Sequence, residues 1–322
     1  MKSIFSSCHM CGSYESEVLT PAFLQTGETC NFQQIVICKK CGLVYKNPVI
    51  PEVNKLVYRQ EDWGSGENFK KRAKDLTEFL ESFLGDIKPK TVIEVGPGPG
   101  WLALELKKIL PDCTYIMFEA SENVAKLAKS NVPDAVVIPS SIGDANFSQG
   151  FASLVISCGV DYLFTDFRRN IDNIYRSLTD EGYLYIERNV FVESEAYNRF
   201  KIETYRDLFG QNELMTTWFA VDQYREFLKL RFEIVSENSF SLDKIDDNES
   251  VIYGFLCKKK KISTEFYDGS ATWYDQNLNS LRRLDSFAPN RDAKGSNGLE
   301  MKEMPSLLKL IMTKVRTVIR SQ

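Results

Sequence analysis

The stretch "VIEVGPGPGW", residues 92–101, constrains the fold more than any other part of the chain. It begins as a run of β-forming residues with one acid and then places glycine at every second position, at Gly96, Gly98 and Gly100. A helical pattern, "WLALELKKIL", follows directly. A strand that ends in a glycine-rich turn and leads into a helix is typical of α/β folds that bind nucleotide-like ligands. We therefore expect a ligand-binding turn at the carboxyl end of a buried strand.

The segments around this turn alternate between strand-like and helix-like patterns. Strands are predicted at residues 91–95, 114–120, 135–138, 151–157, 182–188, 232–239 and 251–259. Helices are predicted at residues 67–87, 101–110, 121–130, 166–178 and 222–230, with Ser121 as an N-cap. Buried strands joined by short helices indicate a Rossmann-like α/β fold, in which helices cover both faces of a mostly parallel sheet.

Three ligands compete for the glycine turn: a nucleoside triphosphate, a dinucleotide and S-adenosylmethionine. A phosphate loop ending in Gly-Lys-Ser/Thr is absent, and Trp101 stands where the dinucleotide pattern needs glycine. Pro97 and Pro99 lack the N–H groups that a phosphate would need. Glu94 beside the turn attracts an ammonium or sulfonium group, and Glu119 is placed to accept hydrogen bonds from ribose hydroxyls. The pattern favours a cationic cofactor without phosphate.

The turn resembles the E-x-G-x-G-x-G signature of class I S-adenosylmethionine-dependent methyltransferases. "LTDEGYLYIER" and "FAVDQYREFLKLRFEIVSENS" resemble the family's segments around its fifth and sixth strands, so the resemblance covers roughly residues 70–260. It implies a seven-stranded sheet with an antiparallel last strand. By position, it implies that the cofactor is bound by Glu94, Gly96, Pro97, Gly98, Gly100, Glu119, Ala120, Ser121, Ser141, Ile142, Ser157, Cys158 and Gly159.

Cysteines are concentrated near the start of the chain. Cys8 and Cys11 form one C-x-x-C pair, and Cys38 and Cys41 form a second. Two such pairs suit a tetrahedral Zn²⁺ site with four thiolates, which would be structural because no coordination position stays open. A pair of redox motifs is the alternative. Cys30 is expected to be a buried strand residue, with metal ligation as a second possibility.

"CHMCG…CKKCGLVYKNP" resembles an N-terminal zinc ribbon that is fused to one group of these methyltransferases. That group includes deoxysugar C-methyltransferases and enzymes of surface-polysaccharide and natural-product clusters. The resemblance implies a sugar, a sugar nucleotide or a polysaccharide precursor as methyl acceptor. It also implies that "YRQEDW", residues 58–63, folds over the cofactor mouth. The expected domains are a zinc-ribbon module at 1–62, a methyltransferase domain at 66–261 and a C-terminal extension at 262–322.

A general base should lie at the carboxyl ends of the fourth and fifth strands. The family often has a Glu-His pair after the fourth strand, and "SCGVDYLF" places Asp161 and Tyr162 there instead. The chain's only histidine is His9, inside the first cysteine pair, so a histidine base is excluded. We expect His9 to be an exposed residue of that turn, with a spare metal donor next to Cys8 as the alternative.

The candidate catalytic residues are therefore Asp161, Tyr162 and Glu187, and Arg188 and Asn189 are candidate substrate binders. Each of the three has a structural alternative: a helix cap for Asp161, a core phenol for Tyr162 and a sheet-end carboxylate for Glu187. The long aromatic segment that follows Glu187 is expected either to cap the substrate site or to form a peripheral helical insertion.

Charge and hydropathy narrow the partners. The net charge is −4, which does not favour nucleic acid, and no apolar run is long enough to span a membrane. A cytoplasmic location is expected, because the first residues lack a signal-peptide pattern. Residues 304–322 form a basic amphipathic pattern that packs on this chain or a second subunit, or else contacts an anionic membrane surface. Two other functions stay open: an RNA methyltransferase and a non-catalytic S-adenosylmethionine-binding scaffold.

Overall fold

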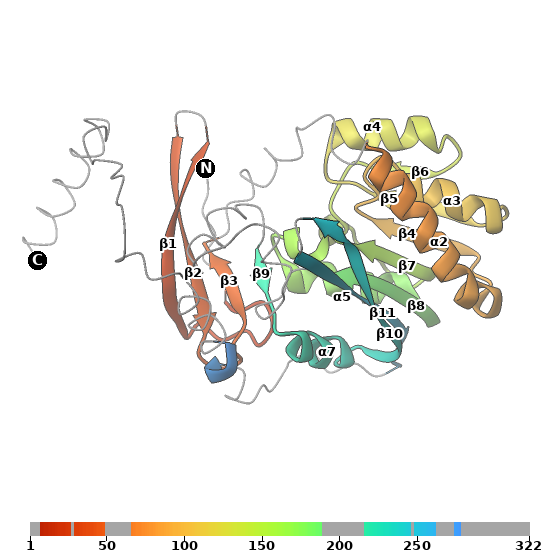
Figure 1. The fold of residues 1–322 in the computed structure, drawn as a ribbon. Helices are drawn as coiled ribbons and strands as arrows, with labels where there is room; N and C mark the ends of the chain where they lie inside the picture. Colours follow the sequence, from red (N-terminus) through yellow and green to blue (C-terminus); the bar gives the residue numbers. More distant parts are fainter. Residues whose placement is uncertain are drawn as a thin grey trace, which may run out of the picture. The chain divides into compact units, whose positions relative to one another are not determined.

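The computed structural model describes residues 7–26, 29–48, 66–188, 216–245, 248–261 and 274–277. The chain divides into two compact units, Met1–Phe287 and Ala288–Gln322, and every described residue belongs to the first. Within that unit the strands form one sheet of seven strands and one of four (Figure 1). The predicted amphipathic tail, "YRQEDW" and Asn189 lie outside the described residues, as does the side chain of Cys30.

The seven-stranded sheet confirms the predicted strands and their order along the chain. Its strands are β4 (Thr91–Val95), β5 (Thr114–Phe118), β6 (Val136–Ile138), β7 (Ala152–Cys158), β8 (Leu178–Arg188), β10 (Phe232–Ile245) and β11 (Asn248–Lys259). In space they follow the order β10-β11-β8-β7-β4-β5-β6. The strands from β6 to β8 pair in parallel, and β11 is antiparallel to both β8 and β10. Strand order therefore reverses at β4 and β7, where α/β sheets bind their ligands.

The helices fall at the predicted positions and cover both faces of this sheet. They are α2 (Glu67–Ile87), α3 (Trp101–Ile109), α4 (Glu122–Asn131), α5 (Phe167–Ser177) and α7 (Val221–Lys229), with short 3₁₀ turns η1 (Ile142–Asp144) and η2 (Asp161–Leu163). Successive side chains of a strand point to opposite faces. Accordingly, Val92 of β4 packs with α2, α3 and α4, whereas Ile93 and Val95 pack with α5 and α7.

The cysteine module, described over residues 7–48, is an antiparallel sheet. Its strands are β1 (Ser16–Thr26), β2 (Thr29–Cys38) and β3 (Val44–Asn47). The fourth strand, β9 (Thr217–Trp218), comes from the predicted methyltransferase segment and pairs antiparallel with β3. The sheet of the module thus includes a strand from beyond the predicted boundary at residue 62.

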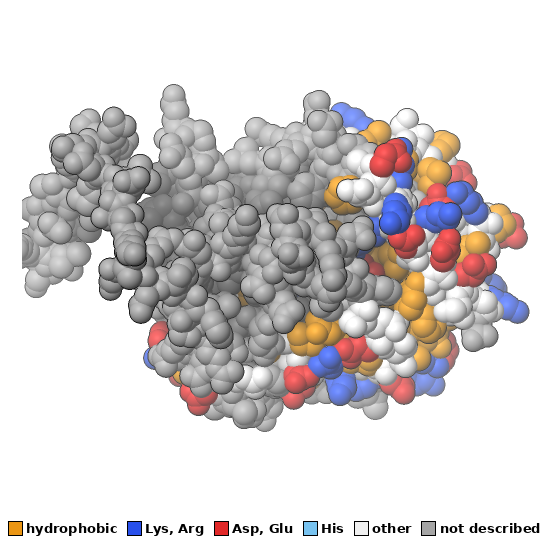
Figure 2. Space-filling view, viewed as in Figure 1, with side chains coloured by type: hydrophobic (Ala, Val, Ile, Leu, Met, Phe, Trp, Pro, Cys, Tyr) orange, Lys and Arg blue, Asp and Glu red, His pale blue; other side chains and the backbone are white. Residues whose placement is uncertain are grey.

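The surface of the described part carries charges of both signs. On the face seen in Figure 2, acidic side chains alternate with lysine and arginine rather than separating from them. None of the helices in the described ranges has the length and apolarity needed to cross a bilayer.

Candidate cofactor site and acceptor site

The turn after β4 needs glycine because its backbone is left-handed at alternate positions. Gly96, Gly98 and Gly100 have φ angles of 65°, 55° and 83°, a region that L side chains rarely adopt. The N–H of Gly96 donates to the carbonyl of Phe118 at 2.8 Å, which holds the turn against the end of β5. The proline between each pair of glycines keeps the intervening φ negative.

The three glycines differ in what surrounds them. A Cβ at Gly96 would lie 2.6 Å from Val160, so this position is packed. A Cβ at Gly98 would meet nothing within 4 Å. The same holds for Gly159 just after β7, where φ is 63°. At the ends of two neighbouring strands, bare backbone therefore borders open space that a side chain would fill.

Two buried acids flank this space. Glu119 follows β5, and its carboxylate accepts hydrogen bonds from the N–H groups of Gly98 at 3.2 Å and Ser121 at 2.9 Å. Burial raises the pKa of Glu119. Glu94 on β4 is only 6% exposed, and its Oε2 has no hydrogen-bond partner among the described residues. Burial, and next the charge of Glu119, raise the pKa of Glu94 to about 8.

The remaining predicted cofactor residues surround the same end of the sheet and differ in exposure. Ser121 caps α4 by accepting from the Val124 N–H, and Ala120 beside it is exposed. The Ser141 hydroxyl accepts from the Gly143 N–H and bonds Asn170 at 2.8 Å, so it holds η1 against α5.

Three further predicted cofactor residues lie in β7 and η1. Ile142, in η1, is fully buried. Ser157 is also fully buried, and its hydroxyl has no partner in the part of the chain that is described. Cys158, which ends β7, is partly buried.

A polar cluster lies at the end of β8 on the α2 face of the sheet. Glu187 is 3% exposed, and its carboxylate receives the Tyr185 hydroxyl at 2.7 Å and the Arg72 guanidinium at 2.5 Å. Cys158 is the register partner of Glu187 on β7, and burial, followed by the charge of Glu187, raises the pKa of its thiol. Arg72 on α2 is 34% exposed at its side chain, so the cluster opens to solvent there.

Arg72 is the residue that holds Glu187 in this cluster. Burial alone would lower the pKa of Arg72, but the charge of Glu187 raises it overall. Tyr162, the second candidate catalytic residue, lies in η2 and is partly buried. No sequence motif marks Arg72, because its partner is 115 positions away.

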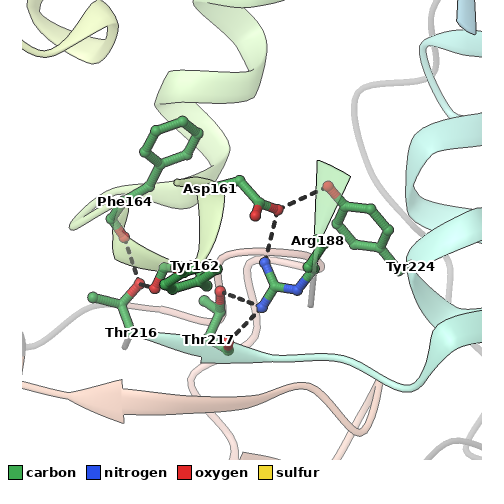
Figure 3. Close-up of polar contacts among 7 residues, drawn as sticks. All are labelled: Asp161, Tyr162, Phe164, Arg188, Thr216, Thr217 and Tyr224. Carbon is green, nitrogen blue, oxygen red and sulfur yellow. Dashed lines mark hydrogen bonds and ion pairs between the residues drawn. The ribbon is translucent and has the colours of Figure 1, made fainter. Parts of the chain in front are cut away.

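Asp161, the third candidate, pairs with Arg188 (Figure 3), whose side chain points to the opposite face of β8 from that of Glu187. Asp161 and Arg188 are both 0% exposed, and Oδ2 of Asp161 meets Nη1 of Arg188 at 2.7 Å. The Tyr224 hydroxyl donates to the same oxygen at 2.8 Å. Arg188 also donates to the carbonyl and the hydroxyl of Thr217. Asp161 is the first residue of η2 rather than a helix cap, and this geometry favours a structural role for both Asp161 and Arg188.

The four cysteines of the two pairs converge in the module. Their sulfurs all lie within 4.8 Å of one another, with Cys8 to Cys41 at 3.4 Å and Cys11 to Cys38 at 3.5 Å. Thiolates around a tetrahedral Zn²⁺ at about 2.3 Å stand about 3.8 Å apart, so the donor set fits this ion. Both pairs use the same turn, in which a glycine with φ near 70° donates its N–H to the first cysteine's carbonyl; the glycines are Gly12 and Gly42.

His9 is buried, and the expectation of an exposed turn residue is wrong. The first cysteine turn packs against the start of α5, where His9 Nδ1 accepts the Phe167 N–H at 3.4 Å. The ring also lies 5.5 Å from that of Tyr45. Burial lowers the pKa of His9 to about 4, although the charge of Asp166 opposes the shift. A neutral imidazole can accept this hydrogen bond.

A family model described as a methyltransferase domain matches residues 68–236, which is more than half of the chain. The chain belongs to the methyltransferase-domain family. This match confirms the prediction of an S-adenosylmethionine-dependent methyltransferase. No curated protein sequence matches the chain significantly.

A solved structure shares the fold of this methyltransferase. The PH0226 protein from Pyrococcus horikoshii is 13% identical, with a TM-score of 0.50, over 63% of this chain and 95% of that chain. The N-methyltransferase NodS from Bradyrhizobium japonicum, solved with S-adenosyl-L-homocysteine, is 13% identical, with a TM-score of 0.48, over 65% of this chain and 97% of that chain.

Proposed function

We propose that this methyltransferase moves the methyl group of S-adenosylmethionine to a hydroxyl-bearing small molecule, a sugar or a sugar-nucleotide or polysaccharide precursor. The observation that carries the proposal is the Glu187–Arg72 pair at the end of β8, beside Cys158 and Gly159. It offers a hydrogen-bond acceptor and a donor at the edge where the open glycine backbone lies. Hydroxyl-rich acceptors need both kinds of group, fixed in position.

The cofactor half of the proposal rests on charge and space. S-adenosylmethionine supplies a methyl group on a positively charged sulfur. Glu94 has a buried oxygen without a partner among the described residues, which suits the ammonium or sulfonium charge. Glu119 keeps acceptor capacity for ribose hydroxyls, and Gly98 lets the cofactor approach the backbone. The remaining positions of the predicted set, from Ser121 to Gly159, border the same sheet edge.

In the acceptor half, Glu187 is the proposed general base. A bound cofactor would supply the methyl group and a neutral thioether as leaving group, and the Glu187 carboxylate would take the proton of the acceptor hydroxyl. Arg72 holds Glu187 in place and neutralises the buried carboxylate before the acceptor arrives. Tyr162, in η2, is the second candidate for contact with the acceptor.

The cysteine module is proposed to hold one structural Zn²⁺ through Cys8, Cys11, Cys38 and Cys41. Four reduced, buried thiols are consistent with the cytoplasmic location that we propose. RNA is the less favoured acceptor, because acidic and basic side chains are interspersed on the described face and the net charge is −4.

The proposal is tested first by calorimetry with S-adenosylmethionine. Glu119→Ala should weaken binding by about 10- to 100-fold, since a charged hydrogen-bond acceptor contributes about 1.5–3 kcal/mol. Glu122→Gln, an exposed acid in the first turn of α4, is the matched control and should bind like the wild type. Wild-type protein that binds no cofactor would contradict the proposal.

The acceptor class is tested with radiolabelled cofactor. Wild-type protein is incubated with a panel of sugar nucleotides and, separately, with total ribosomal RNA. Label in a sugar nucleotide supports the proposal. Label in RNA alone, with binding that weakens steeply as salt rises, would replace the sugar acceptor by RNA.

A further inference from the structure

The two cysteine turns contact the first turns of two helices, α5 and α7. In the first turn, His9 accepts the N–H of Phe167, which begins α5. In the second turn, the Cys41 carbonyl accepts from Gln223 of α7 at 2.6 Å. Gln223 is completely buried, so this contact is shielded from water. The module is therefore tied to the methyltransferase domain through both α5 and α7.

The neighbour of Gln223 on α7 completes a path to η2. Tyr224 donates to Asp161, the first residue of η2, at 2.8 Å (Figure 3). Asp161 in turn is paired with Arg188 at the end of β8. Two consecutive residues of one helix thus reach the cysteine turn and the η2 turn.

The segment that carries β9 makes a second and more direct connection. Thr216 donates its N–H to the carbonyl of Tyr162 at 2.7 Å, and its one hydroxyl hydrogen is shared between the carbonyls of Phe164 at 2.6 Å and Tyr162 at 3.0 Å. Its own carbonyl accepts the N–H of Lys46 on β3 at 3.0 Å. One residue therefore joins the η2 turn to the sheet of the cysteine module.

Arg188 links η2 to β9. Its guanidinium binds Asp161 on one side and Thr217 of β9 on the other, and it lies 5.1 Å and 5.3 Å from the ring centres of Phe219 and Tyr224. Such stacking fixes the plane of the guanidinium. A lysine at this position would keep one charge contact but lacks the fork needed to hold both partners.

We propose that Arg188 and Thr216 are positioning residues that make η2 part of the same rigid unit as the cysteine module. Through them the module sets the place of Tyr162 and of the end of β8, where Glu187 stands. The importance of that place for catalysis rests on the proposed function, whereas the mechanical coupling itself does not. The module thereby holds the acceptor side of the active site, at η2 and the end of β8.

Hydrogen–deuterium exchange of the full chain, measured by mass spectrometry, tests the coupling without an acceptor. In Arg188→Lys and in Thr216→Val, the peptide containing residues 161–164 should exchange about tenfold faster, together with the β3 peptide. Peptides of β4 and β5 should be unchanged, and the Kd for S-adenosylhomocysteine should stay within about twofold.

Two matched controls separate positioning from general loosening. Arg231→Lys changes another buried arginine that pairs with an aspartate, Asp172. Thr77→Val removes another buried threonine hydroxyl that bonds a backbone carbonyl, that of Ala73 in α2. Neither control should accelerate exchange at residues 161–164. Equal acceleration in the controls, or acceleration that spreads to β4 and β5, would overturn the proposal.

A second arm perturbs the module itself. Cys41→Ser should accelerate exchange at residues 161–164 in the wild-type background, and Cys113→Ser, a cysteine outside the module, should not. When Cys41→Ser is combined with Thr216→Val, the joint acceleration should be smaller than the product of the two, because both variants weaken the same connection. Multiplicative effects, or an unchanged η2 peptide in both positioning variants, contradict the coupling. Loss of cofactor binding in the wild type would contradict the proposed function and leave this result standing.

Discussion

Glu187 and Arg188 are consecutive residues at the end of β8, and their side chains point to opposite faces of the sheet. Glu187 meets Arg72 at 2.5 Å on the α2 face, and Arg188 meets Asp161 at 2.7 Å on the face covered by α5 and α7. The cause is the two-residue period of a strand. One strand end therefore carries the proposed base on one side and the anchor to the cysteine module on the other.

Replacing Glu187 tests its role as the base. Glu187→Gln keeps an oxygen for Arg72 and Tyr185 but cannot take a proton, so kcat should fall by about 10²- to 10⁴-fold. Affinity for S-adenosylmethionine should change little. Kinetics with the acceptor found in the sugar-nucleotide screen measures this, and Glu181→Gln, an exposed acid on the same strand, is the control. A kcat within threefold of wild type would contradict Glu187 as the base and leave Tyr162 as a remaining candidate.

Glu94 should make the cofactor-free protein less stable as the pH rises. Its folded-state pKa is about 8 against a usual 4.5, so the folded protein holds this proton more tightly than the unfolded chain. Stability is therefore lost between about pH 4.5 and pH 8, by on the order of 1.4 kcal/mol for each pKa unit. Glu94→Gln removes this loss and should exceed wild type in urea midpoint at pH 8.5 but not at pH 4.5. Equal urea midpoints of wild type and Glu94→Gln at both pH values would contradict a raised pKa of Glu94 in the folded protein.

Cofactor binding should reverse the preference of Glu94 for its protonated form. A cationic ligand favours the ionised form of Glu94, so binding below pH 8 should release a proton from this residue. Calorimetry in two buffers of different ionisation enthalpy counts the protons. Glu94→Gln should release fewer, and the difference isolates Glu94, since the ligand's own titration is common to both proteins. An identical proton count would remove Glu94 from the cofactor site.

Gly98 and Gly96 should respond differently to alanine. Gly98→Ala places its Cβ in open space, so we expect a stability cost of about 1–2 kcal/mol from the left-handed backbone and a cofactor affinity reduced about tenfold or more. Gly96→Ala adds a contact of 2.6 Å with Val160 and should cost more stability. Thermal unfolding and calorimetry measure both. Gly85→Ala in α2, with nothing within 4 Å, is the control and should be neutral or stabilising by about 0.5–1 kcal/mol.

The four clustered cysteines should retain one Zn²⁺ per chain through purification, measured by elemental analysis. Cys38→Ser should lose the metal and several kcal/mol of stability, because zinc binding contributes about 10–16 kcal/mol in small zinc modules. Cys113→Ser, outside the cluster, should keep both. If the wild-type protein contains no metal and is no less stable than the same protein with Zn²⁺ added, a redox role for the two cysteine pairs is favoured instead.

Local patterns were sufficient for the elements and for the ligand-binding turn. The strand "TVIEV", the glycines at alternate positions and the helical spacing of residues 67–87 each depend on neighbours in sequence, and the structure places all three as expected. The two C-x-x-C pairs likewise predict a shared metal site, because each pair forms its turn within five consecutive residues. Such features follow from backbone stereochemistry and side-chain period, which act over short distances.

Contacts between distant segments needed the tertiary structure. Arg72 meets Glu187 only because α2 lies near the end of β8, and no periodic pattern in the sequence predicts which helix packs there. The two-residue strand β9 has too little pattern to be seen in the sequence, yet it completes the sheet of the module. The residues next to Asp161 and His9 in the sequence do not indicate that these two side chains are buried. Their burial depends on how α5 and α7 pack against the cysteine turns. The sequence by itself thus determined the fold and the class of cofactor, whereas the packing of remote elements decided which polar side chains meet, such as Glu187 with Arg72 and Asp161 with Arg188.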